Sequence, residues 1–552
     1  MSDLPFLLVV VLPFAGALLV FLAKGLEDKS GYIAVGAGMA TAIAAIAVIP
    51  KVHGGQAAFS LVVDGLGFFI ALASSVLGAL ILVYSLGYMA HEENLPRYYS
   101  LVLLTIGSVN GLVLSGNALV MAFLWMACSF LTCAIVGFNR ENKAAAPCAR
   151  RALAFGLSGD LILFLGLGLL YYGSGAKGFG IRDIMGAIAA QSSTTALPLT
   201  TAGAYLVLLA SMVRSAQVPL HVWLPGAMEA PSSGSALLDA ATVMNAGVYL
   251  VMRFYPALKS VPGWTESVTW TGSFTILISA LMALYADDIK RMLAFSTMSQ
   301  LGYMFFAVGT GSILGAQFHL MSHAIFKSLL FLAAGSIIHA TGTRDMGKLS
   351  GAASKMPMTG AAFLVGVMGL SGVPFMSGFF SKDMILAGAL AGHQYAALAL
   401  AGLGAVVTVV YSWSAYIRVF RGEISPAVRK AHEAPLSMEI PLAVLSVLTP
   451  FFWLSIGLES SGLHESLPGM GIHEISPLYL VEETFGSAAF VISIVALVLG
   501  FLIVRKRNQV LGWMESHATA LVSACRQGFY FDRLFAMSEG RSARSRKSVG
   551  RK

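Results

Sequence analysis

The chain has 552 residues, of which 57% are hydrophobic and only 11% are charged. An ordinary soluble domain has about 25% charged residues, so this composition excludes a water-soluble fold. The formal net charge of +8 does not indicate a nucleic-acid partner. The basic residues lie in short loops and at the end of the chain, as the positive-inside rule predicts for a membrane protein.

Apolar runs that are long enough to cross a bilayer recur along the whole chain. A membrane-spanning helix needs ~20 predominantly apolar residues. Clear runs are 6–23, 68–84, 153–172, 361–370 with its continuation past Pro374, and 488–504. On this length rule we predict an all-α polytopic membrane protein with about 14 to 16 transmembrane helices.

The polar parts of the chain are brief. The longest are 173–197, 421–435 and 459–483, and none is long enough for a soluble domain. Basic residues at 505–507 follow the last apolar run, and the segment 541–552 is basic and poor in apolar residues. We expect this C-terminal tail to be cytoplasmic and disordered, and any transport to occur inside the helical bundle.

Two predicted helices are interrupted by proline beside a charged residue. Pro219 and Pro225 follow Arg214 in the first. Pro374 precedes Lys382 in the second. Proline removes a backbone donor, and freed carbonyl groups are tolerated in a membrane only where protein or water satisfies them. Paired interrupted helices indicate inverted repeats with an ion site, whereas the alternative is that these prolines only kink helices for packing.

One predicted helix carries three ionisable residues on a single face. His319, His323 and Lys327 are spaced i, i+4, i+8, and each step of four residues turns the helix face by only about 40°. Histidine and buried lysine can both take up and release protons near neutral pH, so the stripe can relay protons. Two alternatives are hydrogen bonding between helices and a zinc site, and the latter lacks a nearby carboxylate or cysteine.

Other ionisable residues lie at or inside the predicted spans. Asp383 follows Lys382 directly, and a neighbouring carboxylate can control the charge of a lysine. Lys290 belongs to the charged cluster 287–291, which is either part of the pathway or a loop cluster without such a role. Asp160 lies deeper in its apolar run. Charges inside a membrane are costly, so each is a candidate functional residue.

Several motifs resemble a known family. The stretches 214–231, 296–303, 318–331 and 378–383 closely resemble the antiporter-like subunits of respiratory complex I and of multisubunit sodium/proton antiporters. The motifs at 63–65 and 528–534 are similar to the distal, largest such subunit. The resemblance runs from about residue 64 to 534. It implies about fourteen core helices that include two inverted five-helix repeats, each a half-channel, joined at the midplane by a row of polar residues.

The resemblance also implies how the chain is divided and which residues conduct. His319, His323 and Lys327 match the family's central connecting residues, and Lys382 matches its terminal lysine on a broken helix. The second half-channel therefore resembles the family pattern throughout. The implied divisions are N-terminal helices 1–100, a first repeat 101–258, a second repeat 259–425, C-terminal helices 426–507 and a cytoplasmic basic tail 508–552.

The first half departs from the family pattern at three positions. Met126 stands where the family has a glutamate, Arg214 where it has a lysine, and Asp239 where it has a histidine. Arginine keeps its proton at any working pH, so Arg214 cannot relay protons. Our hypothesis is that Arg214 and Asp239 form a permanent buried ion pair, with Met126 removing the exchanging carboxylate. Asp160 matches an acidic position of the family and takes over part of that role.

The leading function is therefore a proton- or cation-translocating subunit of a complex-I-like membrane complex. The alternative is a transport-impaired membrane anchor or coupling subunit for a soluble partner, as in a bicarbonate-uptake or hydrogenase-type complex. A third hypothesis, an autonomous sodium/proton exchanger, requires more carboxylates than the bundle provides. The departures in the first half leave the parent complex open among NADH:quinone, hydrogenase-like, antiporter and bicarbonate-uptake assemblies.

No cofactor is expected in this chain. Cys128, Cys133, Cys148 and Cys525 form no CxxC pair, and no glycine-rich nucleotide loop or haem motif occurs. Redox chemistry in a parent oxidoreductase would therefore belong to other subunits. The expected partners are other membrane subunits of such a complex and the lipid bilayer, without nucleic acid. The expected location is the inner, or plasma, membrane of the cell.

Overall fold

A computed structural model describes residues 4–22, 29–52, 56–58, 60–190, 198–467 and 470–531. The N-terminal part consists of long helices and one short antiparallel hairpin. Its elements are α1 (Leu4–Leu22), α2 (Ser30–Val48), β1 (Gln56–Ala58), β2 (Leu61–Val63), α3 (Gly65–Tyr88) and α4 (Leu95–Val113).

The next part contains the first interrupted helix. Its elements are α5 (Ala118–Val136), α6 (Ala145–Ser174), α7 (Ile181–Ala189), α8 (Pro198–Arg214), α9 (Leu224–Ala227), α10 (Ser232–Ala236), a π-helical segment (Leu237–Ala241) and α11 (Asn245–Leu258). The following part contains the second interruption. Its helices are α12 (Trp264–Leu284), α13 (Ile289–Gly309), α14 (Ile313–Thr341), α15 (Pro357–Ser371), α16 (Ser377–Ala391) and α17 (Tyr395–Phe420).

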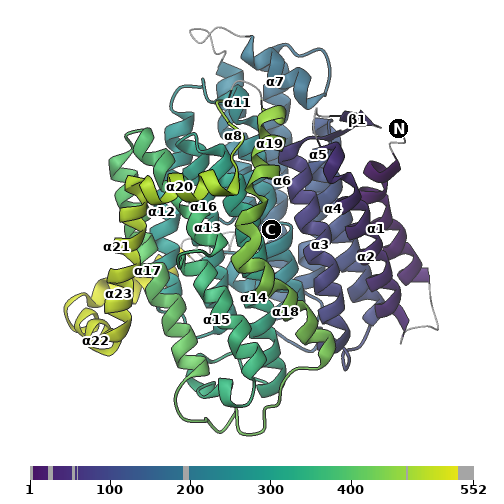
Figure 1. The fold of residues 1–552 in the computed structure, drawn as a ribbon. Helices are drawn as coiled ribbons and strands as arrows, with labels where there is room; N and C mark the ends of the chain where they lie inside the picture. The colour runs from purple at the N-terminus through teal and green to yellow at the C-terminus, as the bar shows by residue number, and fades with distance from the viewer. Residues whose placement is uncertain are drawn as a thin grey trace, which may run out of the picture.

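The C-terminal helices follow the chain to the end of the described residues. They are α18 (Leu436–Phe451), α19 (Ile456–Ser466), α20 (Pro477–Gly486), α21 (Ala488–Arg505), α22 (Arg507–His517) and α23 (Thr519–Arg526). Figure 1 shows the long helices standing side by side, with α1 to α5 on one side of the bundle and α17 and α21 on the other. Helices α22 and α23 project sideways beyond α21.

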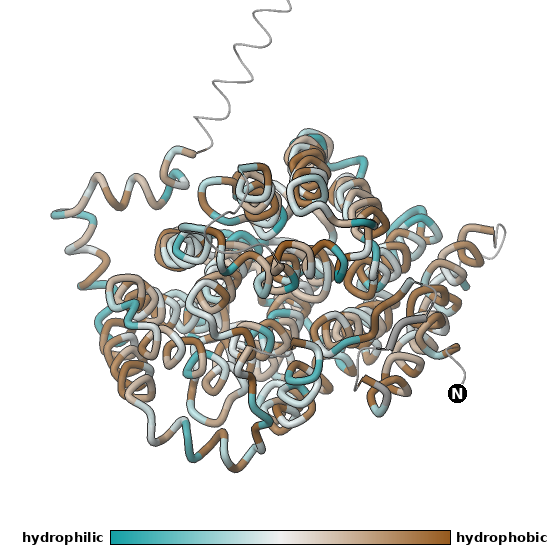
Figure 2. The backbone as a smooth tube through the Cα atoms, turned by 90° about the horizontal axis from the view of Figure 1, so that it is seen from above, coloured by the Kyte–Doolittle hydropathy of each residue, from teal (hydrophilic) through white to brown (hydrophobic). Residues whose placement is uncertain are grey.

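The surface of the bundle confirms a multi-pass membrane protein. Among the described residues, 12 helices are long and apolar enough to cross a membrane. Two shorter apolar helices, α8 and α15, each end at an interruption and bring the number to the lower end of the predicted range. Large apolar side chains such as Leu161 and Val491 are exposed on the outside. Figure 2 shows hydrophobic residues around the whole rim, a distribution that suits contact with lipid.

The two interruptions have the same backbone cause. In a continued helix the N–H of residue 374 would bond to the carbonyl of Leu370, but Pro374 has no N–H. Helix α15 ends at Ser371, and the freed Leu370 oxygen accepts a hydrogen bond of 2.5 Å from Lys382 Nζ. Pro219 frees the carbonyl of Ser215 in the same way, and the Gln217 side-chain amide donates to it at 2.9 Å. Pro225 lies in the first turn of α9.

Helix α14 forms the centre of the second half. Every residue from Ile313 to Ile337 is buried. Helices α3, α13, α15, α16 and α18 pack around it. The polar groups on this part of α14 are therefore enclosed by protein and do not face lipid.

Two polar regions of the sequence contain more helix than expected. The predicted tail, 508–552, begins with α22 and α23, which carry apolar residues such as Leu511 and Leu521 among the basic ones. The segment expected to be disordered, 541–552, lies outside the described residues. The polar stretch 459–483 includes the end of α19 and the start of α20.

A buried ion pair fastens the start of α3 to α11. Arg253 NH2 donates to Asp64 Oδ1 at 2.8 Å, and a second guanidinium nitrogen contacts the other oxygen. Asp64 also caps α3 by accepting from Gly67 N at 3.0 Å. The carboxylate thus satisfies a helix terminus and a guanidinium at once.

Replacing Arg253 with methionine removes the cation from this pair. We expect Arg253→Met to lower the free energy of unfolding by about 3–5 kcal/mol, because the Asp64 carboxylate stays buried without a partner. The double variant Asp64→Asn/Arg253→Met should regain most of the loss. Thermal unfolding of the detergent-purified protein measures both effects, and an equal loss in the double variant would contradict this explanation.

Candidate functional site

The lysine of the α14 stripe is held by α13. Lys327 Nζ donates to the Leu293 carbonyl at 2.7 Å and also contacts Ser296 Oγ. The Lys327 side chain is completely buried. Its hydrogen-bond partners are neutral, so no carboxylate fixes its charge by direct contact.

The two histidines continue the stripe towards α16. Their ring centroids are 6.4 Å apart. His319 Nδ1 lies 2.9 Å from Ser381 Oγ on α16, and its Nε2 lies 3.2 Å from Gln300 Oε1 on α13. Neither ring nitrogen of His323 has a hydrogen-bond partner among the described residues. A buried imidazole in this state can accept or donate a proton through water.

Lys382 and Asp383 adjoin each other but contact different neighbours. Lys382 Nζ bonds to the Leu370 carbonyl at the helix interruption and lies 5.6 Å from the centre of the Tyr303 ring. Asp383 Oδ2 accepts from Ser487 Oγ at 3.1 Å, at the start of α21. Both side chains are buried. The short helix α16 therefore presents a cation to one side and a carboxylate to the other.

Asp239 and Lys290 lie on the side of Lys327 that faces away from the histidines. Together with the α14 stripe, Lys382 and Asp383, they form a row of ionisable side chains. Asp239 lies in the π-helical segment, a geometry that is frequent at functional sites. It interacts electrostatically with Lys327 and Lys290, and its Oδ2 has no hydrogen-bond partner among the described residues. Lys290 Nζ donates to the Ala230 carbonyl at 2.5 Å. The structure thus groups Lys290 and Asp239 with the α14 stripe.

The partner of Arg214 differs from the one we expected. Arg214 NH2 donates to Asp160 Oδ1 at 2.8 Å, so the hypothesis of an Arg214–Asp239 pair is wrong. The reason is the packing of the helices, because α8 lies against α6, which carries Asp160, whereas the segment with Asp239 lies against α14. The permanent cation remains buried and paired, but its carboxylate comes from a different helix.

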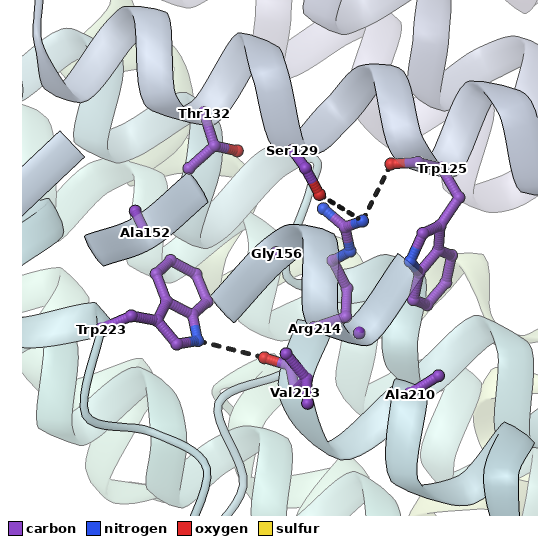
Figure 3. A pocket seen from close by; sticks show the side chains of 10 residues that line it. Trp125, Ser129, Thr132, Ala152, Gly156, Ala210, Val213, Arg214 and Trp223 are labelled. Atoms are coloured by element: carbon purple, nitrogen blue, oxygen red, sulfur yellow. Dashed lines mark hydrogen bonds between the residues drawn. The ribbon is translucent and has the colours of Figure 1, made fainter. Parts of the chain in front are cut away.

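Helix α5 completes the surroundings of Arg214. The Trp125 carbonyl and Ser129 Oγ accept from Arg214 NH2 at 2.8 and 3.0 Å. Figure 3 shows the guanidinium between these two residues. The Trp125 ring centre lies 4.6 Å from the guanidinium carbon, close enough for a cation–π contact. Met126 is half-buried on the same helix and supplies no acceptor side chain. Arg214 therefore keeps its charge in this site and cannot pass on a proton.

A second cluster holds the loop between α9 and α10 in place. Arg344 NH2 donates to Glu229 Oε1 at 3.0 Å, and Asn142 Nδ2 donates to Glu229 Oε2 at 2.8 Å. Arg344 also bonds to the Met228 carbonyl at 3.1 Å. Burial opposes ionisation of Glu229, but the hydrogen bonds from Asn142 and Arg344 outweigh it and lower the pKa of this carboxyl. The α9–α10 loop, whose Ala230 carbonyl binds Lys290, is thus also held by Asn142 and Arg344.

Sequence reasoning missed several residues of these sites. Arg253 was not singled out, although an arginine inside an apolar run needs a buried partner and Asp64 lies in the motif 63–65. Ser381 and Gln300, which bind His319, carried no such signal, because neutral polar residues are common in membrane helices. The described residues contain no group of three or more His, Cys, Asp or Glu that could hold a metal ion.

The fold and the buried ionisable residues of α13, α14, α16 and the π-helical segment define a polytopic membrane protein whose charged groups are enclosed by protein. Residues 115–408 match the family described as NADH:quinone oxidoreductase/Mrp antiporter, TM. Residues 50–99 match the N-terminus of chain 5 of NADH-ubiquinone oxidoreductase (complex I). The chain belongs to the NADH:quinone oxidoreductase/Mrp antiporter transmembrane family.

Curated relatives are longer than this chain. Chain 5 of the NAD(P)H-quinone oxidoreductase of Picosynechococcus sp. is 36% identical over 420 residues, which cover 70% of this chain and 62% of that protein. Subunit A1 of the Na(+)/H(+) antiporter of Staphylococcus aureus is 32% identical over 475 residues, which cover 81% of this chain and 59% of that protein. This chain therefore spans about three fifths of the length of these relatives.

Solved structures show the same fold. A chain of the Mrp complex from Dietzia sp. superimposes with a TM-score of 0.85 at 25% identity and covers 99% of this chain and 60% of its own length. A chain of the membrane-bound sulfane sulfur reductase, an archaeal respiratory membrane complex, gives a TM-score of 0.76 at 23% identity, with 83% and 77% covered. The second likeness concerns the fold alone.

The hydrogen bonds of the Glu229 carboxylate to Asn142 and Arg344 should make the stability of the protein fall at acid pH. A carboxyl with a lowered pKa in the folded state stabilises the protein above its unfolded pKa of about 4.3, and this contribution is lost as the pH falls through the folded value. We therefore expect Glu229→Gln to lower the unfolding temperature at pH 7 and the difference from wild type to shrink below about pH 4. Thermal unfolding between pH 3 and 7 tests this, and a constant difference would contradict it.

Proposed function

We propose that the chain is a proton-translocating, antiporter-like subunit of a multisubunit membrane complex. The observation that carries this proposal is the enclosed row of ionisable side chains from the helix start at Lys290 to the α20–α21 junction. Its members are Lys290, Asp239, Lys327, His323, His319, Lys382 and Asp383. Relatives named as a quinone oxidoreductase chain and as a Na(+)/H(+) antiporter subunit support the same reading.

The residue types in the row suit repeated proton transfer. Histidine and lysine can exist in either charge state inside a protein, whereas arginine cannot. His319 Nδ1 lies 2.9 Å from Ser381 Oγ on α16, and Ser381 directly precedes Lys382. A change in the protonation of His319 therefore alters the electrostatic surroundings of Lys382. The unpartnered nitrogens of His323 can each form a hydrogen bond to water, and such waters would join Lys327 to His319. A proton can then move along short steps without a charge facing lipid.

We propose that the half-channels correspond to residues 101–258 and 259–425, and that only the second switches. The partners would be other membrane subunits of a complex-I-like, hydrogenase-like, antiporter or bicarbonate-uptake complex. The chain would lie in the plasma membrane with its basic C-terminal tail in the cytoplasm, as the positive-inside rule favours.

A second function, a membrane anchor or coupling subunit for a soluble partner, is favoured by one observation. The first half carries the Arg214–Asp160 pair, whose cation cannot release a proton. An anchor needs the fold but not the relay. The enclosed row, which joins Asp239 to the ionisable residues of the second half, supports transport more strongly.

Proton uptake into sealed vesicles carrying the purified parent complex tests the relay. We expect Lys327→Met and Lys382→Met each to reduce potential-driven uptake at least about tenfold, because methionine keeps the length of the side chain but carries no proton. Lys348→Met is the matched control, since Lys348 is largely exposed at the end of a short 3-10 helix (Met346–Lys348). Uptake at the wild-type rate in both assembled variants would favour the anchor.

A paired replacement tests whether the first half conducts. We expect Arg214→Met to destabilise the protein by about 3–5 kcal/mol, because Asp160 loses its partner, and Arg214→Met/Asp160→Leu to recover most of this loss. Proton uptake by the double variant should stay within about twofold of wild type if the ion pair is structural. Thermal unfolding and vesicle uptake give the two readouts, and abolished uptake in a stable double variant would show that the first half conducts.

A further inference from the structure

A third proline interrupts a membrane helix in the C-terminal part of the chain. Pro450 lies in the last turn of α18, and a short 3-10 segment (Phe452–Ser455) joins this helix to α19. Together they form one candidate span from Leu436 to Ser466. A 3-10 stretch inside a long helix often marks a functional hinge. The break resembles the one between α15 and α16, which carries two ionisable residues of the row.

A buried carboxyl group follows this break at the same spacing as at the second interruption. Glu459 comes nine residues after Pro450, as Asp383 comes nine residues after Pro374. Glu459 is completely buried. Its Oε1 lies 3.4 Å from Ser455 Oγ, which is its one polar contact within the described residues, and its Oε2 has no partner there. A buried carboxyl group without a cation beside it is costly in its charged form.

The 3-10 segment packs against both helices that carry the histidine–lysine part of the row. The ring of Phe452 stacks on Phe318, with ring centroids 6.1 Å apart, and Phe318 directly precedes His319 on α14. The ring centroid of Trp453 lies 4.9 Å from that of Phe380 on α16. The interruption that leads to the buried carboxyl group therefore adjoins the row at two places.

The direction of α19 places Glu459 between the α14 stripe and one end of the bundle. Ser466 Oγ, at the end of α19, accepts from Gly65 N at 2.6 Å, at the start of α3. Tyr84, near the end of α3, donates to the Leu332 carbonyl in the second half of α14 at 2.8 Å. Helices α3 and α14 therefore run in the same direction, and α19 points towards the end at which α14 begins. Glu459 lies roughly 10 Å along this direction from the start of the 3-10 segment.

The helices packed against α19 offer few other groups for proton exchange. These helices are α3 and α14. At the start of α3, Asp64 is already paired with Arg253. The basic groups of α14 are those of the stripe, together with His339 near its opposite end. Within α19 itself, His464 and Glu465 are exposed. The stripe therefore supplies the buried groups that can exchange a proton with the carboxyl group.

A cavity with room for water lies next to the same part of the bundle. It measures about 420 Å³ between α16, α20 and the α13–α14 turn, and Asp383 and Ile475 are among its lining residues. Ser460 Oγ, on the residue after Glu459, accepts from Ile475 N at 2.9 Å. At about 30 Å³ per water molecule, the cavity has room for several. A proton that reaches α19 is therefore close to a wet space.

We propose that Glu459 carries protons between the row and the end of the bundle at which α14 begins. The proposal rests on the proposed function, to which it adds one proton-carrying residue. A proton leaves the imidazolium of His319 as its N–H bond breaks, passes through water and forms an O–H bond at Glu459 Oε2. That bond breaks when the proton moves on to water at the end of the bundle. The remaining carboxylate is favoured only while a cation of the row is near, so release of one proton is linked to arrival of the next.

Proton uptake into sealed vesicles carrying the purified parent complex tests this role. We expect Glu459→Gln to reduce potential-driven uptake at least about tenfold, because the amide keeps the shape of the carboxyl group but cannot carry a proton. Glu459→Asp should stay within about threefold of wild type. Glu465→Gln is the matched control on the exposed side of α19. Assembly and unfolding temperature should be the same in all variants, and wild-type uptake in Glu459→Gln would overturn the proposal.

Infrared spectroscopy detects the proton on Glu459 without any transport. In complex labelled with carbon-13 at the glutamate carboxyl groups, we expect a band of a protonated carboxyl group that shifts in heavy water. The band should be missing from Glu459→Gln and present in Glu465→Gln. An unchanged band in Glu459→Gln would show that this residue does not hold the proton, and would overturn the proposal.

The lysine variant separates failure of this proposal from failure of the proposed function. If Lys327→Met abolishes uptake while Glu459→Gln does not, the relay stands and the role of Glu459 is refuted. If Lys327→Met leaves uptake intact, the proposed relay fails, and loss of uptake in Glu459→Gln would still support a pathway through Glu459.

Discussion

The high cost of an unpaired charge away from water governs the arrangement of this bundle. Each charged side chain inside the helices must have a partner, give up its charge or reach a wet cavity. Arg253 and Arg214 follow the first route, with Asp64 and Asp160 as partners. Asp383 follows the third, since it lines a cavity. Lys327 bonds only neutral groups directly, so its charge can change with little rearrangement.

The two halves solve the same problem in opposite ways. In the first half an arginine is surrounded by a carboxylate, a hydroxyl, a carbonyl and an indole ring, so its charge is permanent and paired. In the second half the cations are lysines and the connecting groups are histidines. A fixed ion pair stabilises the packing of α6, α8 and α5, whereas a titratable row supplies the groups of the pathway that we propose. This difference in chemistry exists within one fold, so the helix arrangement alone does not determine whether a buried cation can change its charge.

Sequence patterns were sufficient for features that depend on local periodicity. The apolar runs gave the spans, the i, i+4, i+8 spacing placed His319, His323 and Lys327 on one face, and the prolines marked both interruptions. The partner of Arg214 was not predictable, because Asp160 and Asp239 both lie in buried segments and only the packing of α6 on α8 decides between them. The cavity beside Asp383 could also not be predicted from the sequence. Part of its wall comes from 459–483, a stretch whose polar composition resembles a loop but which contains parts of α19 and α20.

The two interruptions differ in the side chain that satisfies the freed carbonyl. Each proline frees one carbonyl in the membrane, and a nearby side chain must donate to it. At the first interruption the donor is the neutral amide of Gln217, which leaves Arg214 free to pair with α6. At the second the donor is Lys382, so the freed carbonyl is satisfied by a side chain that can change its charge. A proton lost from Lys382 still leaves nitrogen–hydrogen bonds for the Leu370 carbonyl, because a neutral amine keeps two. The second interruption can therefore change its charge without losing its hydrogen bond, which a guanidinium at that position could not do.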